Sequence, residues 1–259
     1  MADILIGPAG SGGSSPENFK RIRDLGLEAV EIAFTHGIWL TREKAEIIKS
    51  ANKKLGLRLS VHAPYYINLN SKETEKVNAS KSRILKSCEI GHYLGAGEIV
   101  FHPGFYLKKP AEETYGAIER EIKGLQKVIR DKKWDVVLSP EITGKPSQFG
   151  SLAELIRLRE NTNCGMTVDF AHLKARNNGI IDYHGLMEAL KTMMPFHSHF
   201  SGIEYTSGGE KKHLLTKAGD TRELLESLLK YRISTTIINE SPAPLEDSVK
   251  MKKILEELT

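Results

Sequence analysis

The chain has 259 residues, of which 40% are hydrophobic and 27% are charged, a composition typical of folded globular proteins and not of disordered ones. No apolar run approaches the roughly 18 residues that a membrane span needs, and we expect no export signal at the start. The formal net charge of +4 permits a nucleic-acid partner without arguing for one. Two cysteines, Cys88 and Cys164, are too few for a disulfide framework, so we expect a cytoplasmic protein.

Short β-rich runs alternate with amphipathic helical stretches along the chain. The predicted strands are Asp3–Ile6, Ala29–Phe34, Arg58–Val61, Glu98–Phe101, Asp135–Leu138, Met166–Val168, Ser198–Phe200 and Thr235–Ile238. The predicted helices are Pro16–Leu25 with Ser15 as its cap, Thr41–Leu55, Lys81–Leu94, Ala111–Arg130, Leu152–Arg159, Leu186–Thr192, Arg222–Leu229 and Leu245–Leu258. Strands alternating with helices indicate a parallel sheet with right-handed crossovers. Eight such units predict a (β/α)₈ TIM barrel that forms one domain over residues 1–259, with an open doubly wound sheet as the alternative.

Imidazole and carboxylate side chains lie at or just beyond the ends of the last six predicted strands. In chain order they are His62, His102, Glu141, Asp169, His199 and Glu240, with His172 and His213 in the loops beyond. In a parallel barrel these strand ends meet at one face, where active sites form. His197 shares a strand face with His199 and is the alternative to it.

Each of these residues alone would be an ordinary structural residue, but together they would repel one another or shift their pKa values unless a cation held them. Nitrogen and oxygen ligands without a thiolate suit Zn²⁺ or Mn²⁺. Because a single catalytic zinc needs about three protein ligands, eight candidates predict two or three ions, with a carboxylate such as Glu141 bridging two. Ions about 3.5–4 Å apart cleave phosphodiesters by generating hydroxide and by stabilising the attacking and leaving oxygens.

Six motifs make up this series; the first two are specific by themselves, and the others gain weight from their order and spacing. They read Val61-His-Ala-Pro-Tyr-Tyr-Ile-Asn-Leu69, Phe101-His-Pro-Gly104, Glu141-Ile-Thr-Gly144, Val168-Asp-Phe-Ala-His172, His199-Phe-Ser-Gly202 and Asn239-Glu240. In this order and spacing the chain, from about His62 to Glu240, resembles the endonuclease IV family of apurinic/apyrimidinic-site endonucleases. The resemblance implies a TIM barrel with three zinc ions that hydrolyses the phosphodiester 5′ to an abasic site in duplex DNA, in base excision repair. It also implies a nucleoid-associated protein, which we expect to be a monomer.

Carried over motif by motif, the resemblance implies a set of ligands for each ion. His62 and His102 would hold the first ion, with Glu141 bridging to a second and lying nearest the nucleophile as the catalytic residue. The second ion would also take Asp169, His199 and Glu240, and the third would use His172 and His213. No side-chain nucleophile is expected.

One loop departs from the family pattern. The family has Asp-x-His there, whereas Lys211 stands two residues before His213. Three alternatives follow: Glu210 supplies the missing carboxylate, the third ion is held more weakly, or Lys212 meets the phosphate directly.

Further residues are candidates for DNA contact. Tyr65 and Tyr66 would stack on or wedge between bases beside an extruded abasic nucleotide, or else pack the loop onto the barrel rim. Predicted loops at the metal-bearing face also carry basic residues suited to phosphate contact, namely Lys145, Lys174, Arg176, Lys211 and Lys212.

Other sequence features are weaker signals. The segment from Gly7 to Gly13 is rich in glycine but lacks a phosphate-binding motif, so we interpret it as a flexible first βα loop. His36, His92 and His184 fall outside the predicted cluster.

Two other functions compete with an endonuclease. A sugar (phosphate) isomerase or epimerase of the same barrel superfamily would need one ion, which Glu141, Asp169, His199 and Glu240 would hold, leaving the other histidines idle. A DNA-binding module without catalysis would need no converging ligands at all.

Overall fold

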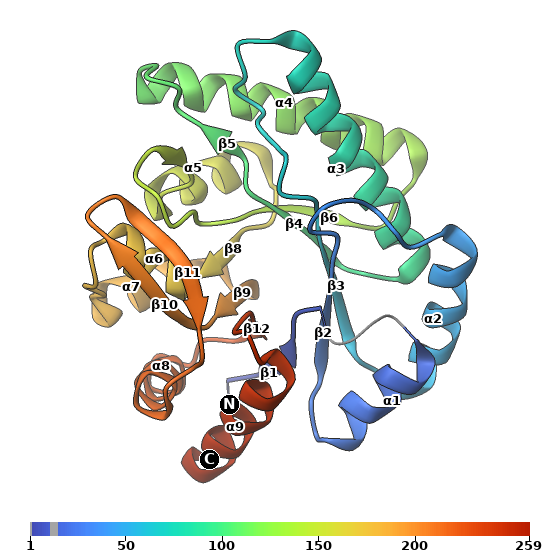
Figure 1. The fold of residues 1–259 in the computed structure, drawn as a ribbon, viewed down its shortest axis with the longest axis vertical. Helices are drawn as coiled ribbons and strands as arrows, with labels where there is room; N and C mark the ends of the chain where they lie inside the picture. Colours follow the sequence, from blue (N-terminus) through green and yellow to red (C-terminus); the bar gives the residue numbers. More distant parts are fainter. Residues whose placement is uncertain (1, 11–14) are drawn as a thin grey trace.

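The structure, a computed structural model, describes residues 2–10 and 15–259. Within these residues, parallel strands alternate with helices along the chain (Figure 1). The strands of the barrel are β1 (Ile4–Pro8), β2 (Ala29–Ala33), β3 (Arg58–His62), β4 (Glu98–Phe101), β6 (Val137–Pro140), β8 (Thr167–Asp169), β9 (Phe196–Phe200) and β12 (Thr235–Asn239). Each of them coincides, within two residues at either end, with a strand predicted from the sequence.

The strands close into a barrel. One parallel sheet has the order β1-β12-β9-β8 and the other has β2-β3-β4-β6. Parallel bridges from Ala9 to Glu31 and from Glu141 to Thr167 join the two sheets at both seams. At the first seam, a Cβ on Gly7 would lie 1.8 Å from the carbonyl oxygen of Ala29, so only glycine allows this close approach. The predicted TIM barrel is confirmed, and the open-sheet alternative is wrong.

Most of the helices begin and end within four residues of their predicted positions. They are α1 (Pro16–Asp24), α2 (Arg42–Leu55), α3 (Thr74–Leu94), α4 (Ala111–Lys132), α5 (Leu152–Thr162), α6 (Phe170–Arg176), α7 (Tyr183–Leu190), α8 (Ala218–Lys230) and α9 (Pro244–Leu258), with a short 3₁₀ turn at Lys191–Met193. The Ser15 side chain accepts a hydrogen bond from the Asn18 amide, as expected for the cap of α1. A reciprocal capping box between Ser151 and Glu154 starts α5. No helix in the described part of the chain has both the length and the apolar character needed to cross a lipid bilayer.

Some elements were not predicted from the sequence. They are helix α6 and two antiparallel ribbons, β5 (Gly104–Phe105) with β7 (Gln148–Phe149) and β10 (Gly202–Thr206) with β11 (Gly209–Leu214). Helix α3 begins at Thr74, seven residues before the predicted start at Lys81. Of the glycine-rich segment, residues 11–14 lie outside the described residues, so the predicted loop is described only up to Gly10.

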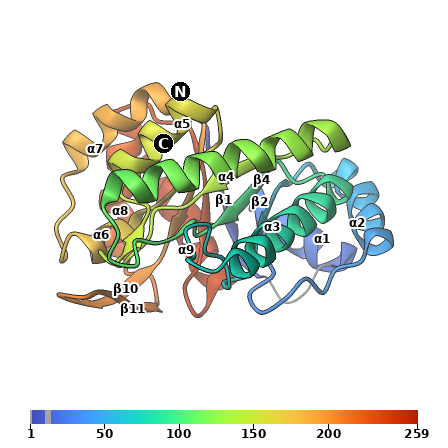
Figure 2. The same ribbon diagram turned by 90° about the horizontal axis from the view of Figure 1, so that it is seen from above.

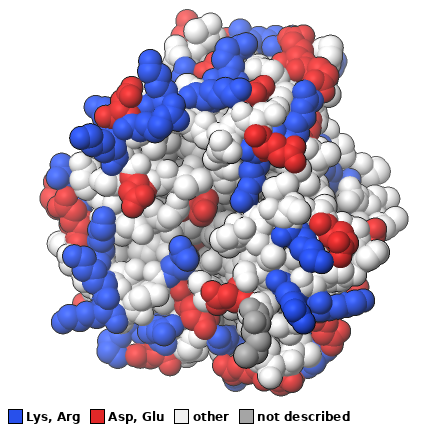
Figure 3. Space-filling model, turned by 180° about the vertical axis from the view of Figure 1, so that it is seen from behind, with Lys and Arg blue, Asp and Glu red and all other residues white. Residues whose placement is uncertain are grey.

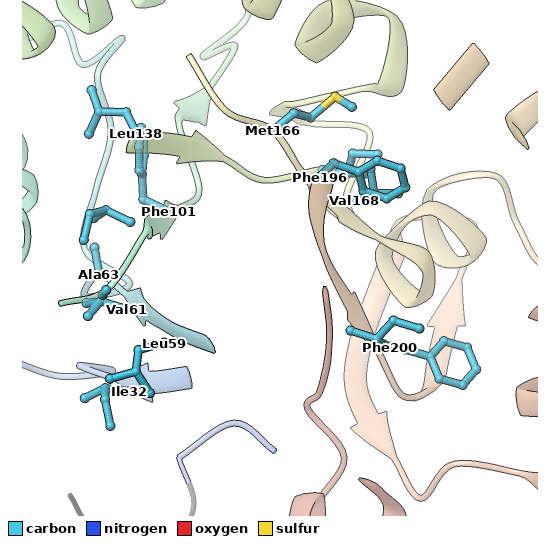
Figure 4. Packing of buried hydrophobic residues seen from close by; sticks show 14 of the residues in the cluster. Ile32, Leu59, Val61, Ala63, Phe101, Leu138, Met166, Val168, Phe196 and Phe200 are labelled. Atoms are coloured by element: carbon cyan, nitrogen blue, oxygen red, sulfur yellow. The ribbon is translucent and has the colours of Figure 1, made fainter. Parts of the chain in front are cut away.

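The two faces of the barrel strands differ in polarity. Leu59, Val61, Val168, Phe196 and Phe200 belong to the hydrophobic core cluster, part of which Figure 4 shows. The alternate positions of the same strands carry polar residues, including Ser60, His62, Thr167, Asp169, His197 and His199, all of them buried. Because side chains alternate across a strand, the apolar set faces the helices and the polar set lines the barrel interior. TIM-barrel interiors are more often filled by Val, Ile and Leu, so this one is unusually polar.

The molecule has two distinct ends along the barrel axis. Figure 2 shows the ribbon β10–β11 at one side and both termini at the other. In Figure 3, drawn from behind the view of Figure 1, Lys and Arg side chains alternate with Asp and Glu around a mostly uncharged centre.

Candidate metal centre

The eight residues predicted from the strand ends lie together at the carboxyl ends of the barrel strands. Most of them end a strand or follow it directly; His172 lies in the first turn of α6 and His213 lies on β11. Together with Glu210, they form three groups of candidate ligands, two of which share Glu141: His62, His102 and Glu141; Glu141, Asp169, His199 and Glu240; and His172, Glu210 and His213. In each group the ligand atoms lie within 4.8 Å of one another, so each group could hold a metal ion.

Glu141 is the centre of the arrangement. Its Oε2 lies 3.1 Å from Nε2 of His62 and 2.9 Å from Nε2 of His102. Its Oε1 lies 3.0 Å from Nδ1 of His199 and 3.3 Å from Nδ1 of His172. The carboxylate is fully buried, so its charge is surrounded by imidazoles and not by water. This shared position is the one that the resemblance implies for a bridging carboxylate.

The contacts of the second group show which of the two histidines of β9 faces the other candidate ligands. His199 Nδ1 lies 3.3 Å from Oε2 of Glu240 as well as beside Glu141, and it belongs to the group that contains Asp169. His197 instead lies 3.0 Å from Glu31, deeper in the barrel. His199 is therefore the residue of this pair that faces the other candidate ligands.

The third group includes Glu210 from the ribbon β10–β11. Its Oε2 lies 3.4 Å from Nε2 of His172, and the rings of His172 and His213 are 5.3 Å apart. Of the three alternatives for the departing loop, the geometry favours a carboxylate supplied by Glu210. Gly144 makes room for it, because a Cβ there would lie 2.7 Å from that same oxygen.

Hydrogen bonds fix the orientation of the imidazole rings. Nδ1 of His62 lies 2.8 Å from the Ala63 carbonyl, and Nδ1 of His172 lies 3.0 Å from the Ile142 carbonyl. A carbonyl oxygen only accepts, so each Nδ1 donates and each Nε2 is left to bind an ion. The Asp169 side chain accepts from the His172 amide at 2.6 Å, which caps α6 and fixes both residues together.

Burial and charge shift the pKa values of the cluster in opposite directions. Burial alone would lower the pKa of His62, but the hydrogen bond and charge of Glu141 raise it to about 9. Burial alone would raise the pKa of Glu141, but the charges of His102 and His199 hold it well below its usual value. For Asp169 burial prevails and raises the pKa. Without ions, the centre thus balances its carboxylates with protons on its imidazoles.

The donor set fits bound metal ions. Asp169 Oδ2 and His172 Nε2 are buried and have no hydrogen-bond partner within the described chain, although buried polar atoms are normally paired. Both atoms point into the groups defined above. The donors are imidazole nitrogens and carboxylate oxygens, and both cysteines are free and buried elsewhere, a set that suits Zn²⁺ or Mn²⁺.

Comparison with known proteins agrees with this fold. Residues 19–258 match the family described as the xylose isomerase-like TIM barrel. The chain belongs to the xylose isomerase-like TIM barrel family. An uncharacterized protein of Methanocaldococcus jannaschii is 35% identical over 98% of both chains. A protein of Mycoplasma genitalium named probable endonuclease 4 is 28% identical over 78% of this chain and 70% of its own.

Two solved structures that superpose on this chain carry names of different activities. Endonuclease IV from Thermus thermophilus superposes with a TM-score of 0.76 at 20% identity, covering 98% of this chain and 99% of its own. A D-tagatose 3-epimerase-like protein superposes with a TM-score of 0.72 at 19% identity, covering 99% of this chain and 96% of its own. Together with the relatives, the first confirms the resemblance to endonuclease IV proteins that the motifs predicted.

A cavity of about 430 Å³ opens above the three groups. His62, His102, His172, His213 and Glu240 line it, together with Tyr65, Lys145 and Gln148. Tyr65 is half exposed, and its ring centre lies 5.9 Å from that of His62. Burial and the nearby carboxylates, Glu240 foremost, raise the pKa of Tyr65 to about 12, so the phenol is neutral at physiological pH. Tyr66 is exposed on the same loop.

Of the five basic residues that were predicted to lie in loops, one does and four lie in regular secondary structure. Lys145 is in the loop between β6 and β7, but Lys174 and Arg176 lie on α6, and Lys211 and Lys212 lie on β11. The loop prediction failed there because the short helix and the ribbon each begin directly after a barrel strand. Lys211 and Lys212 both pair with Glu204, and Lys174 pairs with Asp220.

Arg176 has a structural role that the sequence did not indicate. Its guanidinium donates hydrogen bonds to the carbonyls of Thr143, Lys145 and Gln148 at 3.2, 2.8 and 3.0 Å. It therefore holds the loop that carries Lys145 to the cavity.

The sequence prediction also missed Glu31, which is fully buried in β2 and faces His197 and His199. The available signal was a charged residue between Val30 and Ile32 in an otherwise apolar strand. His92 and His184 bond to Asp135 and Tyr231 away from the centre, and His36 lies beside Tyr65.

Proposed function

We propose that the protein is a metal-dependent endonuclease that hydrolyses the phosphodiester 5′ to abasic sites in duplex DNA. The observation that carries this proposal is the convergence of three ligand groups around Glu141, with His62, His102, His172 and His213 in addition to the four residues that one ion needs. The similarity to proteins named endonuclease 4 supports the same activity. We propose Zn²⁺ as the resident ion, about three per chain, with Mn²⁺ as the substitute.

Each group has a separate task in this proposal. His62 and His102 with Glu141 would hold the first ion, Glu141 with Asp169, His199 and Glu240 the second, and His172 and His213 with Glu210 the third. Adjacent divalent ions supply a nucleophile at neutral pH and neutralise charge on the attacking and leaving oxygens of a phosphodiester. Glu141, the carboxylate shared by two groups, is the catalytic residue.

The residues around the cavity would bind the damaged strand. Lys145 lines the cavity and places a positive charge where a phosphate would enter. Tyr65 offers an aromatic face beside the ligands for stacking on a base next to the extruded nucleotide. Tyr66, Lys174, Lys211 and Lys212 stand further out as candidates for backbone contact, whereas the donors of Arg176 are used by the protein's own backbone.

The experiment uses a duplex with a single synthetic abasic site. Purified protein should cut it once, 5′ to the lesion, and a chelator should abolish cutting until zinc is restored. Glu141→Gln should lower the cleavage rate by at least about 100-fold while the variant still binds the abasic duplex. Cutting by this variant at the parental rate would remove Glu141 from catalysis.

A single-metal sugar epimerase or isomerase is the second candidate. One observation favours it: Glu141, Asp169, His199 and Glu240 form a compact group that could hold one ion alone. The two candidates differ in metal content, because an epimerase of this kind would leave the other histidines without a task. Protein that retains one ion per chain and leaves abasic DNA intact would support the epimerase.

A further inference from the structure

A buried polar cluster lies inside the barrel beneath the candidate metal centre. Glu31 on β2 faces His197 and His199 on β9 and Ser60 on β3, and all four side chains are buried. A carboxylate in this position costs several kcal/mol unless positive charge and hydrogen bonds compensate it. Glu31 belongs to none of the three groups around Glu141, so its burial needs a separate explanation.

The contacts of Glu31 show which neighbours hold it. Ser60 Oγ donates to its Oε2 at 2.8 Å, and Nε2 of His197 lies 3.0 Å from the same oxygen. Nε2 of His199 lies 3.3 Å from Oε2 and 3.1 Å from Oε1. Oε1 has no other partner within the described residues. Ser60 and His197 therefore fix the carboxylate, and its free side is turned to His199.

His199 connects Glu31 to the central group. Its Nε2 faces Glu31, while its Nδ1 lies 3.0 Å from Glu141 and 3.3 Å from Glu240. Because a carboxylate only accepts hydrogen bonds, Nε2 must carry a proton, and Nδ1 is left to bind an ion. In His62 and His172 the ring nitrogen that does not face an ion donates its hydrogen bond to a backbone carbonyl. A carboxylate accepts a stronger hydrogen bond than a carbonyl and makes the imidazole a more basic metal ligand.

We propose that Glu31 is a positioning residue of the central metal group. It fixes the ring and the tautomer of His199, strengthens Nδ1 as a donor, and adds a buried negative charge that complements the cations. His197 and Ser60 act one step further away by holding Glu31. This inference rests on the proposed metal centre but not on the proposed DNA substrate.

The test measures metal affinity without any DNA, so its result is independent of the endonuclease assay. Metal-free protein is titrated with zinc in competition with a chromophoric chelator, and with Co²⁺ to follow the absorption of the bound ion. Glu31→Gln should weaken the affinity of one ion by about 10–100-fold and alter the Co²⁺ spectrum. Glu31→Asp, which keeps the charge, should recover part of the loss.

Glu98→Gln is the matched control. Glu98 begins β4, and within the described residues its buried Oε2 has no hydrogen-bond partner and it belongs to none of the ligand groups. This variant should therefore keep the parental zinc affinity. A merely structural role for Glu31 would lower the melting temperature of metal-free and metal-loaded protein alike, whereas the proposal requires the increment gained on metal loading to shrink.

Three results would overturn the proposal. They are parental affinity in Glu31→Gln, an equal loss in Glu98→Gln, and the loss of one whole ion in His197→Gln, which would make Glu31, His197 and His199 an ion site of their own. If Glu31→Gln does not fold, His197→Gln decides alone. It should keep the number of ions and weaken one of them several-fold, and unchanged affinity would contradict the proposal.

Discussion

Gly144 is a position where one methyl group should disturb the candidate metal centre. An added Cβ would lie 2.6 Å from the Glu210 Cβ, 2.7 Å from its Oε2 and 3.1 Å from His172 Cδ2. Retreat of the loop would break its bonds to Arg176, and retreat of α6 would break the cap at Asp169, so we expect Glu210 to leave the third group. We expect Gly144→Ala to retain one ion fewer than the parent after dialysis against a weak chelator, as measured by elemental analysis.

Gly116→Ala is the control for this substitution. Gly116 lies within α4, and an added Cβ would have no neighbour within 4 Å. Alanine there should stabilise the helix by roughly 0.5–1 kcal/mol and leave the metal content unchanged. Equal ion retention in both alanine variants would show that Glu210 is not a ligand.

Tyr65 should contribute to recognition of the lesion. Its ring lines the cavity beside His62, whereas the adjacent and similarly exposed Tyr66 is not part of the described lining. Stacking of an aromatic ring on a base contributes about 1–3 kcal/mol. Tyr65→Ala should therefore lower the preference for abasic over intact duplex by about tenfold in competition binding, and Tyr66→Ala should change it less. An equal effect of both would assign the preference to the loop as a whole.

Among the elements of the fold, helix α6 holds the loop between β6 and β7 in position. Arg176 on α6 bonds to three carbonyls of residues 143–148, and this loop brings Lys145 to the cavity. Arg176→Met keeps much of the side-chain volume but removes these bonds. We expect faster amide hydrogen exchange confined to residues 143–150 and weaker binding of abasic duplex, with the barrel strands unchanged.

Arg157→Met is the control for a lost guanidinium. Arg157 pairs with Glu112 at 2.7 Å and lies over the Tyr115 ring on the outside of the barrel. Its loss should affect neither the exchange of residues 143–150 nor DNA binding. If exchange around Lys145 is also unchanged in Arg176→Met, the loop is held by its own turns.

The elements that were predicted from the sequence are those with strong local signals. Most barrel strands have apolar residues at alternate or successive positions, and the cap Ser15 marks the start of α1, so local propensity and the final fold agree there. The ribbons and α6 failed because they are short and their stability comes from contacts across the barrel mouth. Glu31 shows the same limit, since only the fold brings it to His199. Glu210 was one of three alternatives from the sequence, and its position beside His172 comes from the fold.

The whole molecule should respond to pH differently with and without metal. Burial alone would lower the pKa of His62, His172 and His199, but neighbouring carboxylates raise all three above the usual 6.5, to about 9 for His62. A histidine whose pKa is raised on folding stabilises the folded state fully below pH 6.5, and this contribution is lost as the pH rises through about 9. The metal-free protein should thus lose stability over this interval.

Bound metal should reverse that trend, because ligand nitrogens must give up their protons to an ion. We expect the melting temperature of zinc-loaded protein to exceed that of chelator-treated protein by a margin that grows from pH 6.5 to pH 9, measured by circular dichroism. Zinc added at pH 7.5 should release protons from these histidines, detectable by calorimetry in buffers of different ionisation enthalpy. A margin that is constant with pH, or zinc binding without proton release, would mean that the imidazoles around Glu141 are not the ligands.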